Sequence, residues 1–165
     1  MSRLFPHTSF VEDQPLSKTL LSTHVLYRGF QTGAILSPAF TFPRYYLSKS
    51  PKPPLLPLLL KNSGRGALIG TGVLTFGLVG RLWGKTEIEW KDRAWRLLEN
   101  EWQMEVDDFS VVGSLVGVGV GLVGMRRGRV PVGRGMVLGS AAVGNVVGVG
   151  AYMIWRHGVK GGKFD

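Results

Sequence analysis

The sequence contains no cysteine among its 165 residues. This absence excludes disulfides, cysteine-ligated zinc or iron–sulfur sites and a thiol nucleophile. Histidine is almost as scarce, because only His7, His24 and His157 occur, without the spacing of metal ligands. No nucleophile, base and orienting group are brought together by any motif, so we expect a non-catalytic protein without a metal or cofactor.

Targeting and nucleotide-binding motifs are missing as well. Residues 1–15 carry a single basic side chain, Arg3, and no long apolar core, which predicts a tail that is neither a secretory signal nor a transit peptide. An organelle address would therefore be internal. The glycine-rich segment 66–83 lacks a following Gly-Lys-Ser/Thr motif, so we expect no bound nucleotide and no small-molecule substrate.

Most acidic residues lie in a small part of the chain, and the net charge is +9. Eight of the eleven carboxylates fall within residues 85–108, whereas the proline-rich segment 41–65 has five basic residues and no acid. A basic protein can attract nucleic acid or anionic lipid. The uneven distribution favours lipid and a fixed orientation in a membrane, so we expect no nucleic-acid partner.

Glycine is abundant, and half of the 24 glycines lie between residues 109 and 155. Small residues recur every fourth position, which places them on one helix face. In water an interior glycine costs a helix roughly 1 kcal/mol relative to alanine, whereas in lipid small residues let two helix backbones pack closely. The predicted packing positions are Gly113, Gly117 and Gly121, then Ser140, Gly144 and Gly148, and finally Gly66 and Gly70, with Gly77 and Gly80 further along.

The apolar segments predict an all-α membrane protein with one membrane domain, residues 16–155, and a short solvated tail, residues 156–165. Four glycine-packed spans are expected at residues 16–40, 66–83, 109–125 and 132–155. The second is about as long as the ~17 residues needed to cross the hydrocarbon core. The first is the least regular, because it contains several polar side chains. An amphipathic helix on the membrane surface is the alternative there, which would leave three spans.

A few polar residues lie within or beside these spans, and each predicts a different kind of contact or environment. Arg28 would be costly inside a membrane, so it could pair with a neighbouring subunit, line a polar cavity or extend toward the surface. Asn145 can form a hydrogen bond between helices. The adjacent carboxylates Asp107 and Asp108 are interpreted as a solvated acidic flank.

The acidic segment 85–108 is also rich in tryptophan. Trp95, Leu98 and Trp102 recur at helical spacing, which predicts one amphipathic helix over residues 91–104. Such a helix could lie on its own bundle or in the headgroups. Alternatively, these three residues could dock a partner, because buried tryptophans surrounded by charge are typical of binding hot spots.

Four spans would place both termini and segment 85–108 on one side of the membrane and segments 41–65 and 126–134 on the other. The second side carries nine basic residues and no acid, so the positive-inside rule assigns it to the matrix or cytoplasm. All five tryptophans fall on or near the opposite side. Four arginines of the second basic loop are expected to bind anionic lipid such as cardiolipin: Arg126, Arg127, Arg129 and Arg134.

Four short spans with rows such as GSLVGVGVGLVG and GSAAVGNVVGVGAYMIW resemble the mitochondrial inner-membrane translocase (Tim-type) subunits. That family also includes an accessory membrane subunit of respiratory complex I. The loop EIEWKDRAWRLLENEWQMEVDDFS is similar to that of a fungal family of small mitochondrial membrane proteins. The translocase signature places an acid four residues after an arginine of the middle loop, but here the corresponding residues are Lys85, Leu97 and Asn100.

The resemblance implies a multi-pass protein of the mitochondrial inner membrane with both termini in the intermembrane space. The function that it implies is that of a non-catalytic accessory subunit, which supports assembly and stability of the membrane arm of complex I. Its partners would be other membrane subunits. The alternative is a translocase or channel component in which Arg28 and Asn145 line a polar path. The departure from the translocase signature favours the first function.

Overall fold

The computed structural model describes residues 2–162. The long helices are α1 (Ser17–Leu47), α2 (Leu55–Leu82), α4 (Glu101–Arg126) and α5 (Arg134–Met153), and α5 continues as a π-helix, Ile154–Val159. A shorter helix, α3 (Glu87–Glu99), lies between α2 and α4 in the sequence, and short 3-10 turns occur at Ser2–Leu4 and Val11–Asp13. Because this described part of the chain contains no strand, the prediction of an all-α protein is confirmed.

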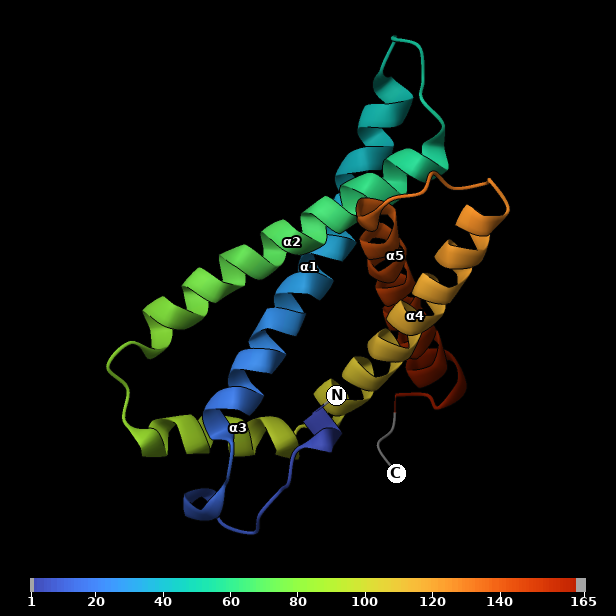
Figure 1. The fold of residues 1–165 in the computed structure, drawn as a ribbon. Helices are drawn as coiled ribbons and strands as arrows, with labels where there is room; N and C mark the ends of the chain where they lie inside the picture. The colour runs from blue at the N-terminus through green and yellow to red at the C-terminus, as the bar shows by residue number, and fades with distance from the viewer. Residues whose placement is uncertain (1, 163–165) are drawn as a thin grey trace.

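The four long helices form two crossed pairs, α1 with α2 and α4 with α5, which meet where α2 packs on α5 (Figure 1). The short helix α3 lies across one end of the bundle, against α1. The 3-10 turn Ser2–Leu4 and the π-helix Ile154–Val159 lie toward this same end, whereas residues 48–54 and 127–133 lie at the opposite end (Figure 1). The acidic and the basic connections are therefore at opposite ends of the bundle.

The proline-rich connection is shorter than the predicted loop 41–65. Helix α1 continues to Leu47, and α2 already begins at Leu55. Pro57 lies in the first turn of α2, where a backbone N–H would have no partner within the helix, so proline is tolerated there. The prolines thus limit the coil to residues 48–54, and the helices on both sides extend into the expected loop.

The single amphipathic helix predicted over residues 91–104 is broken at Asn100. The side-chain oxygen of Asn100 accepts a hydrogen bond from the backbone N–H of Gln103, at 3.1 Å, and so caps the start of α4. This local cap competes with a continuous helix. Trp102 consequently lies on α4, whereas Trp95 lies on α3.

The small residues of α4 and α5 lie at the crossing of these two helices. Gly113 and Gly117 of α4 face Ser140, Gly144 and Gly148 of α5. A Cβ atom on Gly144 would stand only 2.8 Å from the Cα of Gly117, which is closer than real Cβ atoms approach other heavy atoms. The crossing therefore requires small residues on both helices. Gly121 lies against the side chain of Ser140 in the same row.

A second row lies at the crossing of α1 and α2. It consists of Gly29 and Gly33 of α1, which face Gly70 and Gly66 of α2. The later glycines of α2 are not part of a crossing, because a Cβ atom on Gly77 or Gly80 would meet no atom within 4 Å. The part of α2 beyond the crossing extends away from the other long helices (Figure 1).

Large apolar side chains face outward on the long helices. The exposed fraction is 80% for Phe76 on α2, 68% for Val120 on α4 and 63% for Val147 on α5. The accessible surface is 10180 Å², whereas a compact soluble monomer of this mass exposes about 8,000 Å². Two segments of the described chain are long and apolar enough to cross a membrane, Glu101–Arg126 and Arg134–Val159.

Candidate functional site

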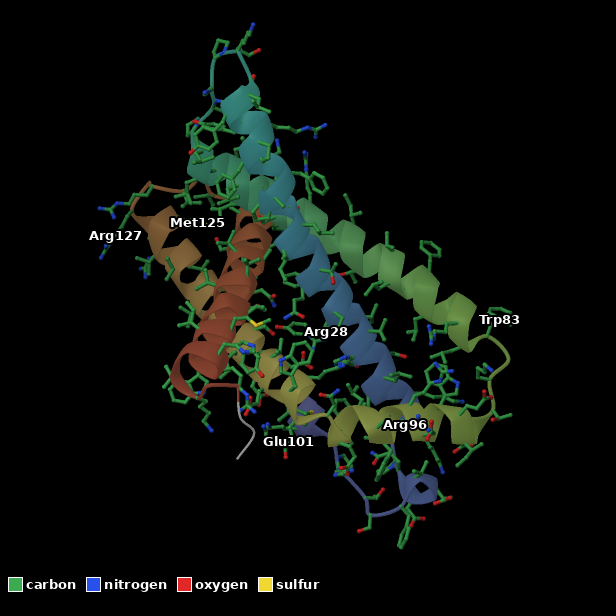
Figure 2. The ribbon with its side chains drawn as sticks, turned by 180° about the vertical axis from the view of Figure 1, so that it is seen from behind. Arg28, Trp83, Arg96, Glu101, Met125 and Arg127 are labelled. Carbon is green, nitrogen blue, oxygen red and sulfur yellow. The ribbon has the colours of Figure 1, made fainter. Side chains whose placement is uncertain are left out.

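One face of α1 carries four polar side chains, which recur three and four residues apart: His24, Tyr27, Arg28 and Gln31. This spacing puts them on a single stripe of an otherwise mostly apolar helix. The stripe faces α4 and α5, and Figure 2 shows Arg28 on that side of α1. Together with residues of α4 and α5 it forms a buried polar network, which we take as the candidate functional site.

An ion pair between Arg28 and Asp107 is the centre of the network. Nη2 of Arg28 lies 3.1 Å from Oδ1 of Asp107, whose side chain is fully buried. The same guanidinium donates to the side-chain oxygen of Gln31 and, at 3.4 Å, to the carbonyl of Gln103. Arg28 thus joins α1 to α4 within one chain.

The interpretation of both neighbouring carboxylates as a solvated flank was wrong for Asp107. Asp108 is partly exposed and pairs with Arg3 at 2.7 Å, whereas Asp107 points into the bundle. One residue of a helix turns by about 100°, so adjacent side chains face different surroundings. The basic partner on α1 makes burial of the Asp107 charge possible.

His24 contacts both members of the Arg28–Asp107 ion pair. Its Nδ1 lies 3.1 Å from Oδ2 of Asp107, and its Nε2 accepts a hydrogen bond from Nε of Arg28 at 3.4 Å. With Nε2 as an acceptor, Nδ1 is the ring nitrogen that donates to the carboxylate of Asp107. A hydrolytic triad would need Nε2 to face a nucleophile, but here Arg28 occupies that nitrogen. The arrangement of these three side chains is that of an ion pair between Arg28 and Asp107 with His24 hydrogen-bonded to both.

A neutral chain of hydrogen bonds extends the network to α5. Nδ2 of Asn145 donates to the Tyr27 hydroxyl at 2.8 Å and to Oγ of Ser114 at 3.2 Å. Ser110 donates its hydroxyl proton to the carbonyl of Asp107 at 3.0 Å, so the Tyr27 hydroxyl must donate to Oγ of Ser110, also at 3.0 Å. Asn145 therefore does form the hydrogen bonds between helices that its position in the sequence suggested.

A second buried charge lies at the end of α5. Arg156 is only 2% exposed, and its Nη1 lies 3.5 Å from Oε2 of Glu105 on α4. The expectation that the tail 156–165 is solvated was therefore wrong at its first residue. The π-helix that continues α5 returns Arg156 toward α4, where the carboxylate of Glu105 offsets its charge.

The three residues predicted to dock a partner have different surroundings. Nε1 of Trp95 donates to the carbonyl of Thr8 at 2.9 Å, which fastens the N-terminal tail to α3. Leu98 is buried in a cluster with Leu20 of α1 and neighbouring apolar residues. Trp102 remains 42% exposed. The amphipathic face of α3 thus packs on its own chain, and only Trp102 of the three has a substantial free surface.

The basic loop predicted to bind lipid borders an apolar cavity. Arg127 and Arg129 line a space of about 630 Å³ between α4, α5 and the start of α2. Its walls include Val120 and Val147. Arg126 and Arg134 end α4 and begin α5 beside it, and Figure 2 shows Arg127 at this end of α4. A basic rim above apolar walls is a suitable arrangement for an anionic lipid.

A family model described as "Protein of unknown function (DUF1757)" matches residues 6–156. The chain belongs to this family. The DUF1757 match includes all five α-helices, the buried network and both ends of the Arg156–Glu105 pair. A comparison with curated proteins gives no match.

Histidine and carboxylate side chains do not cluster in the part of the DUF1757 chain that the structure describes. No group of three or more histidine and carboxylate side chains there lies close enough to hold a metal ion. The two buried ion pairs, Arg28–Asp107 and Arg156–Glu105, each combine one carboxylate with one arginine. Each buried charge is thus matched by an opposite charge of the same chain, an arrangement that fixes the relative positions of the helices.

Proposed function

We propose that this DUF1757 chain is a multi-pass membrane protein that serves as a non-catalytic structural subunit of a larger membrane assembly. The observation that carries this proposal is the inverted distribution of side chains. Charged and polar groups such as Asp107, Asn145 and Arg156 are buried, whereas Phe76 and Val120 are exposed. In water this arrangement would leave a large apolar surface unprotected, but in lipid it is favourable.

The lengths of the helices fit the same proposal. From Arg65 to Trp83, α2 rises about 27 Å, and α4 rises by about the same amount from Asp108 to Arg126, at 1.5 Å per residue. Both values are close to the ~30 Å thickness of the hydrocarbon core. We infer that α1 and α2 span the membrane together with α4 and α5, because the glycine crossings join the helices in two pairs and α2 packs on α5 where Gly64 faces Gly139.

Membership of a larger assembly is supported by α2. Beyond its crossing with α1, this helix extends away from the bundle and exposes Phe76 and Val79 together with Gly77 and Gly80. Small and apolar residues on one exposed helix suit packing against another membrane helix. The resemblance of the sequence to a family of mitochondrial inner-membrane proteins suggests that the assembly is respiratory complex I, with the termini in the intermembrane space.

The geometry favours this function over that of a translocase or channel component. A polar path would need Arg28 and Asn145 to face an open space. Instead Arg28 contacts Asp107, His24 and Gln31, and Asn145 is completely buried. Their side chains act in holding three helices of the same chain together.

The two functions predict that the chain belongs to complexes of different size, and a native gel can separate these complexes. Membranes of the source cells would be washed with alkaline carbonate, solubilised in mild detergent and resolved on a native gel, and the chain would be located by mass spectrometry. We expect it to resist the wash and to migrate with the large NADH-oxidising complex. Migration with the protein-import machinery would support the alternative, whereas small homo-oligomers alone would refute both. Release by carbonate would refute the membrane location itself.

A further inference from the structure

A second cavity, of about 690 Å³, opens between α1 and α2. It extends from the glycine crossing of these helices, at Gly33 and Gly66, to the proline-rich coil that joins them. The buried polar network contributes no residue to it. The cavity is therefore a separate groove on the outer side of the α1–α2 pair, and we call it the α1–α2 groove.

All charged residues that line the α1–α2 groove are basic: Arg44, Lys52 and Arg65. The ammonium group of Lys52 lies 5.5 Å from the ring centroid of Tyr45 and 5.8 Å from that of Tyr46, which holds it beside the groove. The sequence has no acidic residue from position 14 to position 86. The positive charge of this rim is thus not offset by carboxylates of the two helices that form it.

The other half of the groove is apolar. Leu36 and Phe40 of α1 and Ile69 and Val73 of α2 line it, with exposed fractions from 49% to 67%. From Arg65 to the far end of the groove, nine residues on, α2 rises about 14 Å. This is about half of the ~30 Å hydrocarbon core and therefore the depth of one leaflet.

The floor of the groove is built by contacts within the chain. Oγ of Ser37 donates to the carbonyl of Asn62 at 3.0 Å, and Nδ2 of Asn62 donates to Oγ1 of Thr41 at 3.1 Å. These bonds tie α1 to α2 below the basic rim. The groove thus has a fixed shape before any ligand binds, which lowers the entropic cost of binding.

We propose that the α1–α2 groove binds one anionic phospholipid, with its phosphate between Arg44, Lys52 and Arg65 and an acyl chain along the apolar walls. The proposal rests on the membrane location proposed above. It goes beyond the lipid expected at the second basic loop, because the groove lies between other helices. A zwitterionic lipid would leave the net charge of the rim uncompensated, and an acidic segment of a partner would leave the apolar walls uncovered.

The absence of cysteine allows a direct test with a single fluorescent label. The full chain would carry Leu36→Cys in the groove or Phe76→Cys on the exposed face of α2, each labelled with bimane. It would be reconstituted in phosphatidylcholine vesicles that contain increasing fractions of brominated phosphatidylglycerol. We expect half-maximal quenching at position 36 to need an about fivefold lower fraction than at position 76, because basic residues attract anionic lipid. Brominated phosphatidylcholine should quench both equally.

Two further variants locate the cause of the preference. Arg65→Gln should remove the difference between the two labels, whereas Arg81→Gln, near the other end of the same helix, should leave it unchanged. Equal quenching of both labels by phosphatidylglycerol in the wild-type background would overturn the groove proposal and favour an acidic partner segment. Lack of quenching by either lipid at both positions would overturn the membrane location as well, so the two failures are distinguishable.

Discussion

The guanidinium of Arg28 lies 3.1 Å from the carboxylate of Asp107, although 78 other residues separate them in the sequence. This ion pair joins α1 to α4 in the interior of the bundle. Neither charge would be tolerated in the interior of the bundle without the other, because an unpaired buried charge is costly. The pair therefore specifies which face of α1 turns toward α4.

We predict that Asp107→Asn lowers the free energy of unfolding by about 3–5 kcal/mol, the usual cost of removing one partner of a buried ion pair. The asparagine would keep the hydrogen bond to His24 but leave Arg28 without its counter-charge. The double variant Arg28→Gln/Asp107→Asn should lose clearly less than the sum of the two single variants. Denaturant unfolding of the protein in detergent measures all three.

Asp108→Asn is a matched control for these three variants. Its ion pair with Arg3 lies at the surface, so it should cost at most about 1 kcal/mol. Strictly additive effects of the Arg28 and Asp107 substitutions would contradict the pairing. An equal loss for Asp108→Asn would show that burial of Asp107 is not the cause.

We predict that Gly144→Ala destabilises the protein, whereas Gly150→Ala on the same helix does not. A methyl group on Gly144 would overlap the backbone of α4 at Gly113 and Gly117, but one on Gly150 would meet no atom within 4 Å. Alanine should stabilise helix α5 by up to about 1 kcal/mol at the free position. Thermal unfolding in detergent compares the two variants, and a similar shift for both would contradict the crossing of α4 and α5.

The glycine rows could be predicted from the sequence because close helix crossings require small residues at a spacing of four. The sequence did not show which glycines of each row would pack against another helix. Gly66 and Gly70 pack on α1, while Gly77 and Gly80, which continue the same pattern, have no neighbour. Local spacing describes one helix, but the crossing angle decides where two helices separate, and this angle depends on the whole bundle.

The buried network was harder to predict. Asp107 belongs to the most acidic part of the chain, so its composition suggested a solvated side chain. A signal was nevertheless present, because Asp107, Ser110 and Ser114 recur at helical spacing. His24 and Arg28 form a similar stripe on α1. Their pairing across the long sequence separation depends on tertiary packing, which no local pattern contains.

The N-terminus of α3 should respond to acid through Glu89. A hydrogen bond from the ammonium group of Lys85, together with one from the backbone N–H of Thr86, lowers the pKa of the Glu89 carboxyl from 4.5 to about 2. Because the folded pKa is depressed, its stabilising effect is fully present above pH 4.5 and is lost as the pH falls toward about 2. We predict this titration in carbon-13 spectra of glutamate-labelled protein. Lys85→Gln should move the pKa back toward 4.5, and a Glu89 titration near 4.5 in the unsubstituted protein would contradict the hydrogen bonds.

Trp102 should contribute to assembly without contributing much to folding. It is 42% exposed at the start of α4, at the end of the bundle where α3 lies. If it docks on a neighbouring subunit, Trp102→Ala should weaken assembly by about 2 kcal/mol, or roughly thirtyfold, as expected for an interface hot spot. The unfolding free energy of the isolated protein should change by no more than about 0.5 kcal/mol.

The comparison for this prediction is Trp95→Phe. This substitution removes the hydrogen bond to Thr8, so it should make residues 1–15 more sensitive to protease while leaving migration on a native gel unchanged. Trp102→Ala should show the opposite behaviour, with normal protease resistance and a smaller fraction in the large complex. Because both substitutions remove an indole from the same end of the molecule, only their different surroundings can separate the two results. Wild-type migration of the Trp102→Ala variant would exclude this side chain from the interface.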